Sequence, residues 1–121
     1  MKKAKEKTGY SSPTCTARLT SLDDALYVIG GKWKLKIILA LQEGAKRFNE
    51  LQRTVSGISA RVLSNELKEL EMNGFLIRKV QPDIPVTVTY EVTEYSYTLH
   101  NVLEALSEWG IKHRAKIRKE R

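Results

Sequence analysis

Apolar residues recur at intervals of three and four through the first half of the chain, which is the spacing of amphipathic helices. A first helix is expected to start at Ser21, because this serine and Asp24 three residues later resemble a capping box. The Gly30-Gly31 pair offers a left-handed stop for that helix. A second helix follows and is closed by Gly44, and the residues of its apolar face are Trp33, Ile37, Ala40 and Leu41.

Two further helices are expected on either side of a short turn. Phe48 and Leu51 mark a short third helix, and residues 55–58 form the turn. Ser59 can cap a fourth helix, which runs to about Asn73 and is terminated by the glycine that follows. The inward-facing residues of the fourth helix are Leu63, Leu67 and Leu70.

The period of the pattern changes after Gly74. Residues 75–80 and 86–92 are rich in β-branched and aromatic residues, and the segment 82–85 between them holds two prolines, which predicts a β-hairpin. Thr93 is then expected to cap a long helix. The apolar stripe of this last helix comprises Leu99, Val102, Leu103, Leu106, Trp109, His113 and Ile117.

This stripe is longer than the core of one small domain requires, and without a partner it would expose a large apolar surface. We therefore expect the last helix to be a dimerisation element, with all of the stripe except Ile117 at the seam between two copies. His113 is interpreted as a packing residue or a hydrogen-bond partner there.

The order helix, helix, short helix, turn, helix and hairpin predicts a winged helix-turn-helix, a mainly α fold with a small β-hairpin (α+β). In this fold a helix with a polar outer face enters the major groove of DNA, and the hairpin lies against the neighbouring backbone. We expect a basic, flexible arm over residues 1–17 and one winged helix-turn-helix domain, including the dimerisation helix, over residues 18–121.

The charge of the chain favours a polyanionic partner. The net charge is +7, from 21 Lys and Arg against 14 Asp and Glu, and basic residues cluster near both ends. This favours double-stranded DNA over a membrane surface, and the alternative is a charge that serves solubility alone. No apolar signal sequence follows the N-terminal lysines and no run of 18 apolar residues occurs, so a cytoplasmic protein is expected.

The outward face of the fourth helix carries residue types that can read bases. Arginine can form two hydrogen bonds to guanine and asparagine two to adenine. The alternative is an ordinary solvated face, and the hairpin that follows shifts the balance toward DNA. The expected base-reading residues are Arg61, Ser64, Asn65 and Lys68. The expected contacts to the phosphate backbone are Lys32, Lys34, Lys46, Arg47, Arg78 and Lys79.

The sequence contains no catalytic or cofactor-binding motif. His100 and His113 have no cysteine or carboxylate at a convincing metal-ligand spacing, and neither a Gly-rich phosphate loop nor a nucleophile elbow occurs. The single cysteine, Cys15, excludes an intrachain disulfide. Arg18 and the nearby start of the first helix favour a reactive thiolate, whereas a lone cysteine can equally be a small buried hydrophobic residue. We expect neither an enzyme nor a cofactor.

Several runs of residues together resemble the HxlR-type transcriptional regulators. The most specific are the Gly-Gly-Lys-Trp run at 30–33 and the Arg-Phe-x-x-Leu run at 47–51. The resemblance covers roughly residues 15–113. Its other parts are Cys15 in the N-terminal arm and residues 25–29, 57–59, 63–71, 73–76 and 90–93.

The resemblance implies a homodimer that is held together by its N-terminal and long C-terminal helices and reads a pseudo-palindromic operator. It also implies that Cys15 responds to an oxidant or an electrophile, as the arm cysteine does in several family members. Two positions depart from the family pattern. Thr87 lies where family wings often carry an arginine, which leaves Arg78 and Lys79 as the expected backbone contacts of the wing. Thr16 follows the cysteine where a proline is common.

Two other functions fit the same fold. A small apolar ligand held near Trp109 could gate DNA binding, although the positions of Trp33 and Trp109 on apolar helix faces favour a role in the core. The winged helix could instead be a protein-interaction module. That function would need a less basic recognition face and an exposed apolar patch, and neither is evident in the sequence.

Overall fold

The structure of the protein, a computed structural model, describes residues 12–120. It divides the chain into two compact units, Met1–Gly31 and Lys32–Arg121. Most of the expected basic arm, residues 1–11, lies outside the described residues. None of the helices within residues 12–120 is long and apolar enough to cross a membrane.

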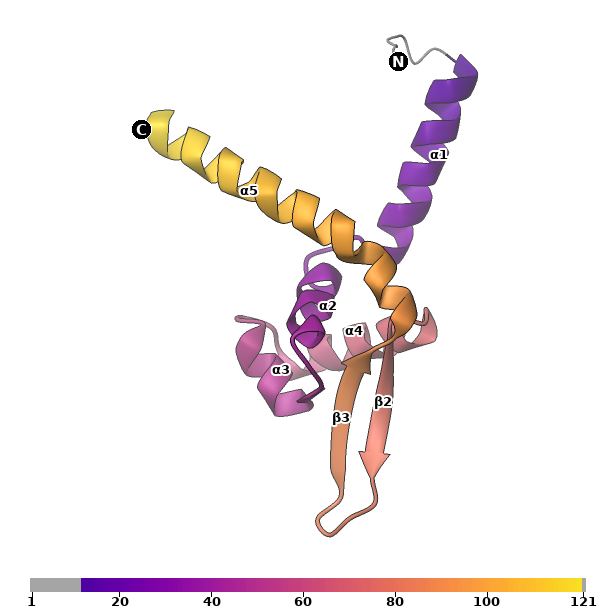
Figure 1. The fold of residues 1–121 in the computed structure, drawn as a ribbon, viewed down its shortest axis with the longest axis vertical. Coiled ribbons are helices and arrows are strands. Elements are labelled where there is room, and N and C mark those ends of the chain that lie inside the picture. Colours follow the sequence, from indigo (N-terminus) through magenta and orange to yellow (C-terminus); the bar gives the residue numbers. More distant parts are fainter. Residues whose placement is uncertain (1–11, 121) are drawn as a thin grey trace. The chain divides into compact units, whose positions relative to one another are not determined.

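The first unit contains helix α1, Ser12–Ile29 (Figure 1). The expectation that this helix starts at Ser21 is therefore wrong. The hydroxyl of Ser21 donates a 3.1 Å hydrogen bond to the carbonyl of Ala17, so it is satisfied one turn back within α1 and does not cap it. The expected end is confirmed, because α1 stops before Gly30 and Gly31 adopts a φ of +96°.

The second unit has the order of elements of a winged helix-turn-helix, as predicted. Helices α3 and α4 form the helix-turn-helix, and strands β2 and β3 form the wing (Figure 1). The elements are α2 (Lys34–Gln42), β1 (Lys46–Arg47), α3 (Phe48–Thr54), α4 (Ala60–Met72), β2 (Leu76–Gln81), β3 (Thr87–Val92), the 3-10 helix η1 (Glu94–Leu99) and α5 (His100–Glu120).

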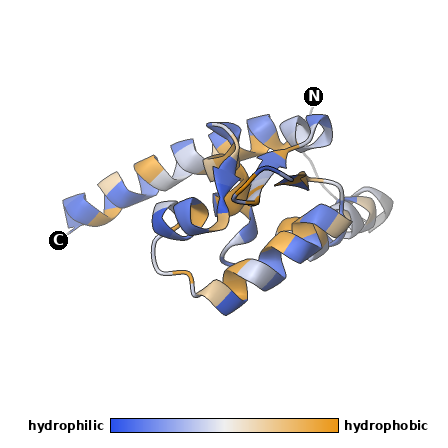
Figure 2. Ribbon diagram, turned by 90° about the horizontal axis from the view of Figure 1, so that it is seen from below, coloured by the Kyte–Doolittle hydropathy of each residue, from blue (hydrophilic) through white to orange (hydrophobic). Residues whose placement is uncertain are grey.

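The core of the second unit lies between the apolar faces of its helices and the base of the sheet. Figure 2 shows hydrophobic and hydrophilic residues alternating along the helices, as amphipathic packing requires. The predicted inward face of α4 is confirmed. Each fully buried aliphatic side chain contributes about 1.5–3 kcal/mol to folding. The most deeply buried side chains are Ile37, Ile38, Leu41, Leu51, Leu63, Leu67, Leu70 and Leu76.

Both ends of α4 are fixed by local sequence, as predicted. The side-chain oxygen of Ser59 accepts a hydrogen bond from the backbone N–H of Val62 over 3.1 Å, which satisfies a free donor in the first turn. At the other end, Asn73 is the C-cap residue and Gly74 has a φ of +83°, a conformation in which a side chain would be strained. These two ends define the length of helix that is available to a ligand.

The sheet is antiparallel and has the strand order β1-β3-β2. The hairpin of β2 and β3 was predicted, whereas β1 was not, because two residues are too short to show a strand pattern. Lys46 of β1 and Arg78 of β2 both lie opposite Tyr90 of β3. The sheet thus brings together basic residues that are far apart in the sequence.

The connection from the wing to α5 differs from the prediction. Thr93 does not cap a helix with its side chain; its hydroxyl donates a 2.5 Å hydrogen bond to the carbonyl of Gly74 at the start of the hairpin. The backbone N–H of Thr93 also donates to the carbonyl of Phe75 over 3.1 Å. These bonds close the base of the wing, and η1 intervenes before α5 begins at His100.

Candidate nucleic-acid interface

The outward side of α4 is a polar surface built by the packing of its leucines. Because three leucines point into the core, residues at the intervening positions face away from it. Spacings of three and four place the four expected base-reading residues on one side of the helix. Arg61, Asn65 and Lys68 are exposed and Ser64 is half-buried.

These four side chains are available to a ligand. Within residues 12–120, none of them forms an ion pair or a side-chain hydrogen bond. Arginine and lysine supply hydrogen-bond donors and positive charge, and an asparagine amide supplies both a donor and an acceptor. This combination suits the base edges of a DNA major groove, which present acceptors on guanine and a donor-acceptor pair on adenine.

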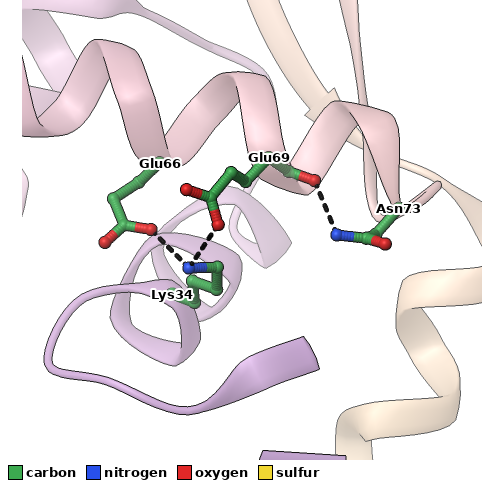
Figure 3. Close-up of polar contacts among 4 residues, drawn as sticks. All are labelled: Lys34, Glu66, Glu69 and Asn73. Carbon is green, nitrogen blue, oxygen red and sulfur yellow. Dashed lines mark hydrogen bonds and ion pairs between the residues drawn. The ribbon is translucent and has the colours of Figure 1, made fainter. Parts of the chain in front are cut away.

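One flank of α4 is occupied by an ion-pair cluster that the sequence did not predict (Figure 3). The ammonium of Lys34, in the first turn of α2, lies 2.6 Å from Oε1 of Glu66 and 3.0 Å from Oε1 of Glu69. The side chain of Lys34 is only 12% exposed. At the end of the helix, the amide of Asn73 donates to the backbone carbonyl of Glu69 over 3.0 Å.

The cluster corrects the expectation that Lys34 contacts DNA phosphates, because its ammonium is enclosed by two carboxylates. Burial by itself lowers the pKa of Lys34, but hydrogen bonds and charge interactions with Glu66 and Glu69 outweigh it, so the pKa is raised. Lys34 is therefore held in its charged form between α2 and α4. The sequence does place two acidic residues, Glu66 and Glu69, three positions apart on the flank of one helix, but this spacing does not show that Lys34 is the cation that binds them.

The loop before α2 and its first turns carry two further cations. The Nζ atoms of Lys32 and Lys36 lie 4.8 Å and 5.1 Å from the centroid of the Trp33 ring. Both lysines are exposed, and Trp33 is half-buried. A cation beside an aromatic ring is stabilised by about 0.5–1 kcal/mol at an exposed site. Lys36 was not among the expected contacts, although it is two residues from Lys34.

The four expected phosphate contacts of the sheet differ in their surroundings. Lys46 is partly buried and its Nζ lies 3.5 Å from a carboxylate oxygen of Glu43. Arg47 is exposed and precedes α3. Arg78 is exposed and makes no ion pair within the described part of the chain, whereas Lys79 lies 3.0 Å from Glu91.

The apolar stripe of α5 is largely uncovered. Leu103 is buried, but Leu106 is 51% and Trp109 is 63% exposed. The interpretation of Trp109 as a core residue is therefore wrong for the single chain; its ring instead stacks on that of His113, with the centroids 4.9 Å apart and the planes 9° from parallel. The expected seam residues Leu99 and Val102 are half-buried and 39% exposed, respectively.

Cys15 lies in α1, where it is half-buried. Spacings of four, three and four place it on one side of the helix with Leu19, Leu22 and Leu26, all of which are exposed. The structure thus moves Cys15 from an irregular arm into a helix with an apolar stripe. Residues 12–120 contain no cluster of His, Cys, Asp or Glu that could hold a metal ion.

Comparison with known proteins gives matches over most of this chain. A family model described as HxlR-like helix-turn-helix matches residues 28–118. The HTH-type transcriptional regulator YtcD of Bacillus subtilis is 41% identical over 93 residues, which are 77% of this chain and 74% of YtcD.

Two solved structures are similar in both sequence and fold. The redox regulator HypR in its oxidized form has a TM-score of 0.72 and 38% identity, over 76% of this chain and 95% of HypR. The reduced form of the transcriptional regulator YodB from B. subtilis has a TM-score of 0.67 and 37% identity, over 74% of this chain and 87% of YodB.

Proposed function

The chain belongs to the HxlR-like helix-turn-helix family and is a DNA-binding transcriptional regulator, not an enzyme; we propose that it acts as a homodimer on a pseudo-palindromic operator. The observation that carries this proposal is the outward face of α4, where exposed Arg61, Asn65 and Lys68 have no partner within residues 12–120. Unpaired donors and acceptors on a rigid, capped helix are what base recognition requires.

In the proposed complex, α4 lies in the major groove. Arg61 would grip a guanine through its O6 and N7 atoms, and Asn65 would bind an adenine through its N6 and N7 atoms. Ser64 and Lys68 complete the reading surface. Each well-aligned pair of hydrogen bonds discriminates against a wrong base by about 1–3 kcal/mol.

Phosphate contacts would flank this helix. On one side they come from Lys32, and on the other from among the basic residues of the sheet, which are Lys46, Arg47, Arg78 and Lys79. Such contacts position the protein on the duplex without reading its sequence, and the net charge of +7 favours them. The protein would work in the cytoplasm, where this target lies.

The dimer would form through α1 and α5. The exposed apolar stripe of α5, which includes Leu106 and Trp109, needs a partner surface because exposed apolar area of this extent favours association. A second copy supplies that surface by symmetry. It also sets the two α4 helices at the spacing of successive major grooves, about 34–36 Å.

The trigger would be chemistry at Cys15. The relatives HypR, described as a redox regulator in an oxidized form, and YodB, solved in a reduced form, support a redox response in this chain, and Cys15 is its one thiol. Two Cys15 thiols, one from each chain, would be oxidised to one disulfide, and their two protons and two electrons would reduce one hydrogen peroxide to two water molecules. An electrophile such as a quinone would instead form a thioether with a single thiolate.

The function can be tested by selecting duplexes from a random library with the purified protein. The expected result is enrichment of two inverted half-sites about 10 base pairs apart, with enrichment lost for the double variant Arg61→Ala and Asn65→Ala. Recovery of unenriched DNA by the unsubstituted protein would overturn the proposal of sequence-specific recognition.

A further inference from the structure

The two faces of the three-stranded sheet carry different sets of polar residues. Directly opposite residues of an antiparallel pair point to the same face, and successive residues along a strand point to opposite faces. Tyr90 of β3 lies opposite both Lys46 of β1 and Arg78 of β2, so these three side chains form one row across the sheet. The neighbouring row, on the opposite face, comprises Arg47, Thr89 and Lys79.

The face of the Tyr90 row is free of acidic strand residues. On the opposite face, Glu91 lies two residues from Thr89, and its carboxylate is 3.0 Å from Nζ of Lys79. Arg78 has no ion-pair partner within residues 12–120. Adjacent basic residues of one strand therefore differ, because Lys79 is neutralised locally and Arg78 is not.

The Tyr90 row lies on the face that looks toward the helices. Leu76, two residues before Arg78 on β2, is on the same face and is buried in the core, and its cross-strand partner Val92 is half-buried. Figure 1 shows β2 and β3 continuing beyond the helices of the second unit. In the proposed complex α4 lies in the major groove and the wing lies against the neighbouring backbone, so this side of the wing is a candidate surface for the adjacent phosphates.

Tyr90 adds a neutral donor between two cations. Its side chain is half-buried and its hydroxyl makes no hydrogen bond within the described part of the chain. Tyrosine hydroxyls are among the groups that contact DNA phosphates. The flanking Lys46 keeps a loose contact of 3.5 Å with the exposed Glu43 and can exchange it for a stronger anion.

From this arrangement we propose that Lys46, Tyr90 and Arg78 form a phosphate-binding row on one face of the sheet, and that Arg47 and Lys79 do not bind the same duplex. The Tyr90 hydroxyl donates to a phosphate oxygen, and the two cations stand on either side of it. The proposal rests on the DNA-binding function. The proposal adds the uncharged Tyr90 to the phosphate contacts. It also assigns the basic residues of the sheet to two faces, one that binds DNA and one that does not.

The test compares paired substitutions on opposite faces of the same strand: in one pair each substitution removes a positive charge, and in the other each removes a hydroxyl. The pairs are Arg78→Gln against Lys79→Gln, and Tyr90→Phe against Thr89→Val. Binding is measured by fluorescence anisotropy on a random-sequence duplex of about 30 base pairs, over a series of KCl concentrations, since phosphate contacts need no operator. Thermal unfolding checks that each variant is folded.

Arg78→Gln should make the negative slope of log affinity against log salt shallower by about 0.9, the value for one phosphate contact. Lys79→Gln should leave the slope unchanged. Tyr90→Phe should weaken binding about 10- to 150-fold at constant slope, as expected for one hydrogen bond to a charged group, and Thr89→Val should have no such effect. If the Lys79 and Thr89 variants lost as much affinity as the Arg78 and Tyr90 variants, or more, the assignment of the two faces would be overturned. The DNA-binding function would not be affected by that result. Failure of the unsubstituted protein to bind any duplex would refute the DNA-binding function, and the assignment with it.

Discussion

The ammonium of Lys34 lies 2.6 Å from Oε1 of Glu66 and thereby joins the first turn of α2 to the flank of α4 (Figure 3). Glu69, one turn further along α4, accepts from the same ammonium over 3.0 Å. Helix α2 is anchored in the core through fully buried Ile37 and Ile38. The ion pairs therefore connect the helix that would read DNA to a fixed part of the domain, on a flank that leaves its outward face open.

Replacing Lys34 by methionine should destabilise the fold by about 1–2 kcal/mol, because it leaves two neighbouring carboxylates without their shared cation. Urea unfolding followed by circular dichroism would measure the loss. The matched control is Lys68→Met on the exposed face of α4, where the change should stay within about 0.5 kcal/mol. Equal effects of the two substitutions would show that the ion pairs do not contribute to stability.

The same pair predicts a dependence of stability on alkaline pH. The pKa of Lys34 is raised in the folded state, so its contribution is complete below the pKa of an unfolded lysine and is lost as pH rises through the folded value. The difference in unfolding free energy between the unsubstituted protein and Lys34→Met should stay constant from about pH 7 to 9 and shrink above about pH 10.5. If the difference in unfolding free energy between the two proteins were still unchanged at about pH 11.5, the charge of Lys34 would not be the source of the stabilisation.

Base-reading residues and phosphate contacts should fail in different ways. Arg61→Ala and Asn65→Ala should reduce the preference for an operator over random DNA by about 1–3 kcal/mol each, since base contacts are lost only on the specific site. Lys32→Ala should lower affinity for both duplexes alike. Anisotropy titrations on the two duplexes at one salt concentration would distinguish these patterns. Equal losses on both duplexes would remove Arg61 from the base-reading set.

The parts of the fold that the sequence predicts are those with local signals. For α4 the serine at 59, the leucine spacing and the glycine at 74 each act within a few residues, and the helix begins and ends as expected. The start of α1 was missed because the serine, threonine and proline residues between Ser12 and Thr20 are typical of turns and caps, and they obscured the helical spacing of Cys15 and Leu19. The Ser21 hydroxyl, which resembled that of a capping residue, donates to the carbonyl of Ala17 four residues back.

The parts of the site that could not be predicted depend on residues far apart in the chain. Lys34 looked like any other basic residue near a DNA-binding motif, and its burial follows only from the packing of α2 beside α4. The division of the sheet also depends on β1, because Lys46 pairs with Tyr90 of β3 although the two residues are far apart in the sequence. Charge along a sequence identifies candidate contacts, but strand register decides which of them share a face.

Dimerisation should depend on the apolar stripe of α5. Leu106→Glu should give monomers or aggregates, because a buried carboxylate at a seam between two copies costs several kcal/mol. Sedimentation velocity would measure the effect. The control is Ile111→Glu, since Ile111 is 68% exposed and lies on the other side of the same helix. A stable dimer of the Leu106 variant would exclude the stripe as the seam.

The last prediction concerns Cys15, which α1 presents on the same side as Leu19 and Leu22. If this stripe packs near its symmetry mate, oxidation joins two chains, because each contains one cysteine. Peroxide should then give a doubled mass on a non-reducing gel and release of operator DNA, because a covalent link at the seam changes the separation of the two α4 helices. Cys15→Ser should fold and bind DNA normally but no longer respond. A serine variant that still releases DNA on oxidation would exclude Cys15 as the sensor.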